Sequence, residues 1–182
     1  ESLGTVRQKA ERLEKLACAL SADAQLSAAD AADAKRAARL CKADLVTNAV
    51  IEFTSVQGVM GSYYAAASGE TQAIGQHYQP RFAGDALPDT TVGKLVALAD
   101  KLDTICGLFA VGQGPTGSSD PFALRRSAIG IVNMLEAGLP ISLAAAIDES
   151  LASFATQGVA FDAAAVRAEV VDFFVTRTKV ML

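Results

Sequence analysis

Residues 92–111 read Val92-Gly-Lys-Leu-Val-Ala-Leu-Ala-Asp-Lys-Leu-Asp-Thr-Ile-Cys-Gly-Leu-Phe-Ala-Val111. Apolar side chains recur in this stretch at steps of three and four residues, at Leu95, Leu98, Leu102, Ile105 and Phe109. Such spacing puts the side chains on one face of an α-helix. The stretch therefore predicts a long helix with a continuous apolar face.

The rest of the chain shows helical periodicity in further stretches. Helices are predicted at residues 3–21, 28–54, 63–67, 70–78, 120–137, 142–156 and 162–182. The stretch 28–54 is expected to form one long helix, because Leu40, Val46 and Phe53 fall on a single apolar face. No segment alternates apolar and polar residues as a strand does, so we expect an all-α fold.

Two loops separate these predicted helices, at Gln79–Thr91 and at Gly112–Ser119. The second loop has the glycine spacing of a phosphate-binding loop. It carries Ser118 where such a loop needs a lysine, and a predicted helix rather than a strand precedes it. We therefore expect no nucleotide binding there. Asp120 and Pro121 follow, and they are predicted to be the N-cap and first residue of the next helix.

The amino-acid composition indicates which class of protein this is. The 182 residues are 51% hydrophobic, which is enough for a domain with a sizeable core. The three cysteines, Cys18, Cys41 and Cys106, form no CxxC pair and are expected to be buried apolar residues in a reducing compartment, the cytoplasm. No apolar run reaches the roughly 20 residues that span a bilayer. The chain begins at Glu1 in helical sequence, and both ends read as cuts through a longer protein.

Charge is distributed unevenly. The net charge of −4 argues against a globally basic nucleic-acid-binding protein. Residues 1–42 nevertheless carry eight basic and six acidic groups, whereas residues 43–182 carry eight basic and fourteen acidic groups. Lys35, Arg39 and Lys42 are spaced to form one stripe on a helix, which predicts either a phosphate-binding surface or an ordinary solvated face.

Two further features could carry chemistry. Asp100 and Asp103 lie three residues apart on the predicted helix, so their carboxylates could meet and bind a metal. The alternative is a solvated face beside Lys101. His77 is the one histidine of the chain, which excludes a site with two histidine ligands within it. A hydrogen-bonded structural histidine is the expected alternative to a ligand.

Several longer runs of residues match one known family in order and spacing. These runs are Lys42-Ala-Asp-Leu-Val-Thr47, Gln57-Gly-Val-Met-Gly61, Tyr78-Gln-Pro-Arg-Phe-Ala-Gly-Asp85, Ala97-Leu-Ala-Asp-Lys-Leu-Asp-Thr104 and Pro115-Thr-Gly-Ser-Ser-Asp-Pro-Phe-Ala-Leu-Arg-Arg126. On these runs the chain resembles an interior part of the β subunit of bacterial glycyl-tRNA synthetase. The likeness is densest over residues 40–130.

The resemblance implies an α₂β₂ enzyme whose α subunit activates glycine with ATP and Mg²⁺, and whose β subunit helps to bind tRNA-Gly. It implies an HD-domain-like helical bundle over residues 1–138. A helical extension over residues 139–182 would lead towards an anticodon-binding region. The role expected for this chain is a non-catalytic, tRNA-contacting and scaffolding part of the synthetase, with no cofactor of its own and no membrane contact.

The HD likeness also makes a prediction about individual residues. An active HD site holds a divalent metal through one histidine, a His-Asp pair and a later aspartate. The corresponding positions here carry Lys9, Ala43, Asp44 and Asp100, so both histidines are missing. Asp44 and Asp100 could still hold Mg²⁺, but our hypothesis is that Lys9 pairs with one of them in place of a metal. A working HD phosphohydrolase and a pure subunit-interface module are the alternative functions.

Basic side chains are the candidates for contact with tRNA, because arginine and lysine neutralise backbone phosphates. The candidates are Lys35, Arg39, Lys42, Arg81, Arg125 and Arg126. Each has a structural alternative: Arg81 could bond to Asp85, and Arg125 and Arg126 could bond to the adjacent loop.

Overall fold

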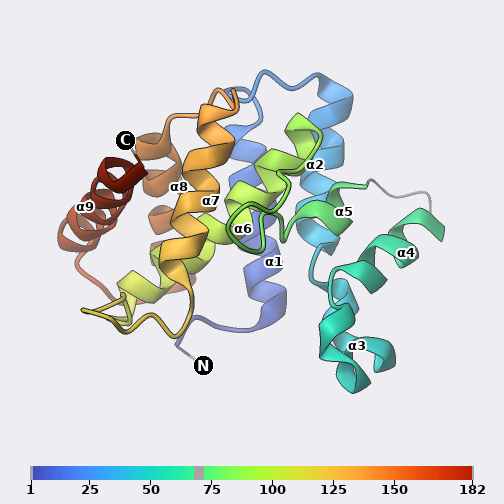
Figure 1. Ribbon diagram of the computed structural model, residues 1–182, viewed down its shortest axis with the longest axis horizontal. Helices are drawn as coiled ribbons and strands as arrows, with labels where there is room; N and C mark the ends of the chain where they lie inside the picture. The colour runs from blue at the N-terminus through green and yellow to red at the C-terminus, as the bar shows by residue number, and fades with distance from the viewer. Residues whose placement is uncertain (1, 68–71, 182) are drawn as a thin grey trace.

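The computed structural model describes residues 2–67 and 72–181, and it is helical (Figure 1). The α-helices are α1 (Val6–Leu20), α2 (Ala28–Leu40), α3 (Asn48–Glu52), α4 (Val59–Ala67), α5 (Ala73–Gln76), α6 (Thr91–Ala110), α7 (Leu124–Glu136), α8 (Leu143–Gln157) and α9 (Ala163–Met181). Two 3₁₀ turns, η1 (Ala43–Val46) and η2 (Thr54–Val56), flank α3. The described residues contain no strand, and the predicted all-α fold is confirmed.

Helix α6 lies at the centre of the bundle and packs against α1, α2, α5, α7, α8 and α9 (Figure 1). The hydroxyl of Thr90 caps its start by accepting a hydrogen bond from the amide of Gly93 at 2.9 Å. Leu95, Leu98 and Leu102 are fully buried, as the apolar spacing predicts. Burial extends to all sides of the helix and includes the charged residues Asp100, Lys101 and Asp103, around which the candidate site lies.

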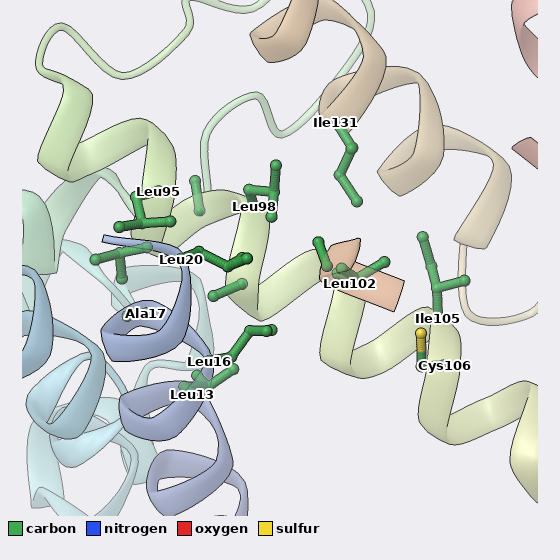
Figure 2. Packing of buried hydrophobic residues seen from close by; sticks show 14 of the residues in the cluster. Leu13, Leu16, Ala17, Leu20, Leu95, Leu98, Leu102, Ile105, Cys106 and Ile131 are labelled. Atoms are coloured by element: carbon green, nitrogen blue, oxygen red, sulfur yellow. The ribbon is translucent and has the colours of Figure 1, made fainter. Parts of the chain in front are cut away.

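The core is formed where α1 and α7 meet α6. Leu13 and Leu16 of α1 and Ile131 of α7 are buried beside the α6 leucines (Figure 2). Full burial of a leucine or isoleucine side chain stabilises a fold by about 1.5–3 kcal/mol. This apolar contact fixes the helices firmly enough to hold charged groups between them.

The predicted long helix over residues 28–54 is wrong. Helix α2 ends at Leu40, and the chain continues through η1 and α3. The hydroxyl of Thr47 accepts from the amide of Val50 and starts α3 as a separate helix. The expected apolar face is consequently divided, and Val46 and Phe53 are 78% and 67% exposed.

The start of α7 also differs from the prediction. The helix begins at Leu124 rather than Pro121, after Ala123 in a left-handed conformation. The carboxylate of Asp120 still accepts from the amides of Leu124 and Arg125, at 2.8 and 3.0 Å. The prediction of Asp120 as the N-cap is therefore wrong, because Ala123 takes that position, although the Asp120 carboxylate still binds the first amides of the helix.

Helices α8 and α9 pack on the bundle. Helix α8 contacts α1 and α6, and α9 contacts α6 and α7. Ser142 caps α8, whereas Asp162 accepts from the first amides of α9. The division of the chain at residue 138 stays a prediction, and residues 70–71 of the predicted helix 70–78 lie outside the described residues.

Two expectations about environment can be compared with the structure. Cys41 and Cys106 are buried, but Cys18 is exposed on α1, so the prediction was wrong for Cys18. Within the described ranges, no helix is both long enough and apolar enough to cross a membrane.

Candidate functional site

Five charged side chains meet between α1, α6 and the end of α2. This charge cluster consists of Lys9, Arg12, Lys42, Asp100 and Asp103. Lys9 and Arg12 are three residues apart on α1, and Asp100 and Asp103 are three apart on α6, so each pair shares a helix face. The two faces meet because α1 and α6 pack against each other.

Lys9 joins the two carboxylates of α6. Its Nζ lies 3.1 Å from Oδ1 of Asp100 and 3.0 Å from Oδ2 of Asp103, and it donates to the hydroxyl of Thr104 at 2.9 Å. Burial alone would lower the pKa of Lys9, but the two carboxylates outweigh burial and raise it. The hypothesis that Lys9 pairs with an aspartate is confirmed for Asp100.

Arg12 binds Asp103 with both arms of its guanidinium. Nε lies 2.7 Å from Oδ1 and Nη2 lies 3.0 Å from Oδ2, which is the bidentate geometry of strong arginine–carboxylate pairs. Nη1 donates to Gln157 of α8 and to the carbonyl of Leu3, and the guanidinium stacks on the ring of Phe154. One buried side chain therefore ties α1 to both α6 and α8.

Lys42 belongs to this interior cluster, so its predicted place on an exposed basic stripe is wrong. It is 6% exposed, and its Nζ lies 2.8 Å from Oδ2 of Asp100. Its ammonium also lies over the ring of Tyr78. Because α2 ends at Leu40, the helical spacing from Lys35 does not reach Lys42, and the side chain turns inward.

His77 is fully buried against Lys42. Lys42 Nζ lies 2.9 Å from Nε2, and Nδ1 lies 2.6 Å from the carbonyl oxygen of Ile74. An ammonium only donates and a carbonyl only accepts, so the imidazole is neutral with its proton on Nδ1. Burial, reinforced by the charge of Lys42, lowers the pKa of His77 to about 3. The predicted structural role of this histidine is confirmed.

Asp44 binds backbone amides of the segment before α4 and of α4 itself. Its Oδ2 accepts from the amides of Gly58 and Gly61 at 2.6 and 3.1 Å and so holds the start of α4. Ala43, which the HD likeness predicts to stand in place of a histidine ligand, is exposed at the start of η1. Across residues 2–67 and 72–181, no three metal-ligating side chains come together. The ligands of an HD metal centre therefore do not come together here, because the ammonium groups of Lys9 and Lys42 already bind the carboxylate oxygens of Asp100.

Lys35 and Arg39 lie on the surface and face acidic residues of α1. Lys35 is 3.9 Å from Glu14, and Arg39 is 3.4 Å from both Glu11 and Glu14. Partly exposed pairs of this kind contribute about 0–1 kcal/mol and exchange partners readily. Contact of these two side chains with RNA stays a prediction.

The remaining basic candidates gather near the start of α7. Arg125 donates to the carbonyl of Gly117 at 2.6 Å, and Arg126 donates to the carbonyl of Arg81 at 3.3 Å. The backbone amide of Arg81, not its guanidinium, bonds to Asp85 at 2.7 Å. Arg81 and Arg126 thus lie together at a surface pocket, whereas Arg125 bonds to the loop before α7.

Comparison with known proteins gives the family. The sequence profile of the glycyl-tRNA synthetase beta subunit matches residues 1–182. The chain belongs to the glycyl-tRNA synthetase beta subunit family. The glycine–tRNA ligase beta subunit of Haemophilus influenzae is 47% identical over 182 residues, covering 97% of this chain. That of Acidithiobacillus ferrooxidans is 44% identical over 187 residues and covers 99% of this chain.

The match covers only part of these relatives. In the glycyl-tRNA synthetase beta subunits of Haemophilus influenzae and Acidithiobacillus ferrooxidans it extends over 26% of the relative's length. The protein from Acinetobacter baumannii is 48% identical over 161 residues, which is 86% of this chain and 22% of that protein. The chain spans about a quarter of the length of the family members that it matches.

The sequence did not predict two of the buried charged residues: Arg12, which anchors three helices, and Lys101, which lies in the interior. Lys101 is 8% exposed, and its Nζ donates to the carbonyls of Tyr78 and Gln79. One signal was present in the sequence. Charged residues in a helix that is otherwise apolar on all sides must be buried, and buried charges require partners.

Proposed function

We propose that this chain is a non-catalytic part of a glycyl-tRNA synthetase β subunit that contacts tRNA-Gly and serves as a scaffold. In this proposal an α subunit performs the ATP- and Mg²⁺-dependent attachment of glycine, within an α₂β₂ assembly in the cytoplasm. Family membership over the whole sequence and the names of the relatives support the proposal.

The observation that supports the non-catalytic role is that two lysines already bind the carboxylate of Asp100, a position that would hold the metal in an active HD site. Lys42 and Lys9 lie 2.8 and 3.1 Å from its two carboxylate oxygens. Burial alone would raise the pKa of Asp100, but these ammonium groups hold it well below its usual range. A divalent metal would have to displace both ammonium groups, which favours a structural role over hydrolysis.

Surface cations support contact with tRNA. Lys35, Arg39, Arg81, Arg125 and Arg126 are at least partly exposed, and phosphate neutralisation needs accessible charge. The test reverses these charges to glutamate, one at a time, in the full α/β enzyme and measures tRNA-Gly affinity against salt concentration. Reversal of a side chain that binds one RNA phosphate should lower the salt slope by about one.

Arg167→Glu is the matched control, because Arg167 lies on α9 in an exposed pair with Asp148. Equal tRNA affinity and equal salt slope in all reversed variants and in this control would remove the proposed RNA contact. Metal analysis of the purified full-length β subunit tests the rival phosphohydrolase: a bound stoichiometric metal with phosphatase activity would favour that rival.

A subunit-interface module is the second candidate, and one observation favours it. The segment from η1 to α4 projects from the bundle (Figure 1) and exposes Val46, Ile51, Phe53 and Tyr63, all more than half accessible. Exposed aromatic and aliphatic groups gathered in this way are typical of interaction sites. Phe53→Ser should weaken α/β assembly in sedimentation experiments if this segment is an interface. Unchanged assembly would leave the tRNA-contacting role without this rival.

A further inference from the structure

A pocket of about 360 Å³ opens beside the charge cluster. Its wall is formed by η2, by residues 78–81, by α6 and by the start of α7. Three cationic side chains line it: Arg81, Lys101 and Arg126. Thr54, Ser55 and Ser127 add hydroxyl groups, which can donate hydrogen bonds.

The pocket has one carboxylate among its lining residues, Asp100, and that charge is already neutralised. Lys9 and Lys42 both lie within 3.1 Å of its oxygens. Among the residues that line the pocket, three cations therefore stand beside this single carboxylate. An excess of positive charge at a partly buried site favours an anion.

The cations of the pocket retain unused donors. Lys101 gives two of its three ammonium protons to the carbonyls of Tyr78 and Gln79, at 3.1 and 2.9 Å. Arg126 has one bond, to the carbonyl of Arg81. Within the part of the chain that the structure describes, the Arg81 guanidinium makes no hydrogen bond or ion pair.

These donors also lie close enough to influence one another. Burial lowers the pKa of Lys101 to about 8, opposed by Asp100, and the positive charges of Lys42 and Arg81 contribute to the lowering. Like charges held together in this way repel each other, and an anion between them would relieve the repulsion. Pro80, which lines the pocket, is buried, so this part of the pocket wall is packed against the rest of the protein.

We propose that this pocket binds a phosphate group. Two guanidinium forks, an ammonium and several hydroxyls supply more donors than a carboxylate can accept, whereas a tetrahedral phosphate presents three or four oxygens to them. The group could belong to an RNA backbone or to a free nucleotide, and both present the same chemistry. The inference goes beyond the proposed function, because a phosphate site could exist without any contact between this chain and tRNA.

The test uses the full-length β subunit and titrates it with inorganic phosphate, 5′-AMP and tRNA-Gly by calorimetry. The Arg81→Gln/Arg126→Gln double variant removes two exposed charges, so folding should be retained, and circular dichroism checks this. Loss of charge-assisted bonds should weaken phosphate binding by about tenfold or more. The matched control is Arg167→Gln, since Arg167 lies on α9 in an exposed pair with Asp148 and does not line the pocket. It should change phosphate affinity less than about twofold.

The probes separate the sources. If the double variant weakens tRNA-Gly as well as phosphate, the occupant is an RNA phosphate; if 5′-AMP binds more tightly than phosphate and tRNA-Gly is unaffected, it is a nucleotide. Both results support the site. Equal phosphate affinity in the wild type and the double variant, or no phosphate binding at about 10 mM, overturns it. The proposed tRNA contact fails separately: unchanged tRNA-Gly binding after charge reversal at Lys35, Arg39, Arg81, Arg125 and Arg126 removes it, whereas weaker inorganic phosphate binding by the double variant still supports the pocket.

Discussion

The ammonium of Lys42 lies 2.9 Å from Nε2 of His77, and burial together with this contact keeps the histidine neutral. The other ring nitrogen donates to the carbonyl of Ile74, so protonation would place two positive charges in contact. Asp100 and Lys101 are the other charged groups that influence the ring. The stability of the region around α5 and α6 should therefore depend on pH through this histidine.

We predict that this region loses stability as the solution becomes acidic. The pKa of His77 is lowered to about 3 in the folded chain, whereas an unfolded histidine titrates near about 6.5. The unfolded state then binds more protons below pH 6.5, so the stabilisation is complete above that pH and is lost as pH falls towards 3. Between pH 6.5 and 5 the expected loss is about 2 kcal/mol.

Hydrogen exchange of peptides from α5 and α6, measured in the full-length β subunit at both pH values, checks this loss. His77→Gln is the control, because glutamine can accept from Lys42 but does not titrate. If the variant keeps the same pH dependence as the wild type over this interval, His77 is not its cause.

Substitution of Lys9 by alanine should destabilise the contact between α1 and α6. The change removes the cation shared by Asp100 and Asp103, which then keep only Lys42 and Arg12 as partners. Breaking a buried pair costs about 3–5 kcal/mol, and partial access of solvent to Lys9 reduces the expected loss to about 2–3 kcal/mol. Hydrogen exchange in α1 is the measurement.

Arg7→Ala provides the comparison for Lys9. Arg7 pairs with Glu11 on the exposed side of the same helix. Its loss should change stability by less than about 0.5 kcal/mol, as for other exposed helix pairs. Equal protection of α1 in wild type and Lys9→Ala would show that the ion pair has no structural role.

The sequence predicts the bundle well where local spacing decides the outcome. Apolar side chains at steps of three and four predicted α1 and α6. The break after Leu40 was missed because Asp44 holds the amides of Gly58 and Gly61, an arrangement that helical periodicity cannot encode. The structure of the segment after Leu40 therefore depends on contacts between residues far apart in the chain.

In the candidate site, too, contacts between residues far apart in the chain could not be predicted from local spacing. Lys9 and Asp100 are 91 residues apart, and no spacing rule brings them together. Their pairing was expected from the HD likeness alone. The position of Lys42 was predicted from helical spacing and was wrong, because that spacing assumes a helix that continues beyond Leu40.

Replacement of Arg12 by lysine should loosen α8 from the rest of the bundle. Lysine cannot reproduce the two parallel bonds to Asp103 or the stacking on Phe154. We expect a loss of about 2–3 kcal/mol, seen as faster hydrogen exchange in both α1 and α8.

Arg167→Lys is the matched control for this change, because the Arg167–Asp148 pair is also bidentate but exposed. It should cost less than about 1 kcal/mol. A smaller effect for Arg12→Lys than for Arg167→Lys would contradict the assignment of Arg12 as the anchor between α1, α6 and α8.

Lys35 and Lys42 should respond to neutralisation in opposite ways, although both belong to one predicted basic stripe. Lys35 is exposed, so Lys35→Met should lower the salt slope of tRNA-Gly binding by about one and leave stability nearly unchanged. Lys42 is buried against Asp100 and His77, so Lys42→Met should reduce stability by about 3 kcal/mol while the salt slope stays the same. The two variants are compared in the full enzyme by tRNA-Gly binding titrations at several salt concentrations. Each titration is made below the melting temperature of its variant. A drop in salt slope for Lys42→Met with unchanged stability would mean that this side chain reaches RNA after all.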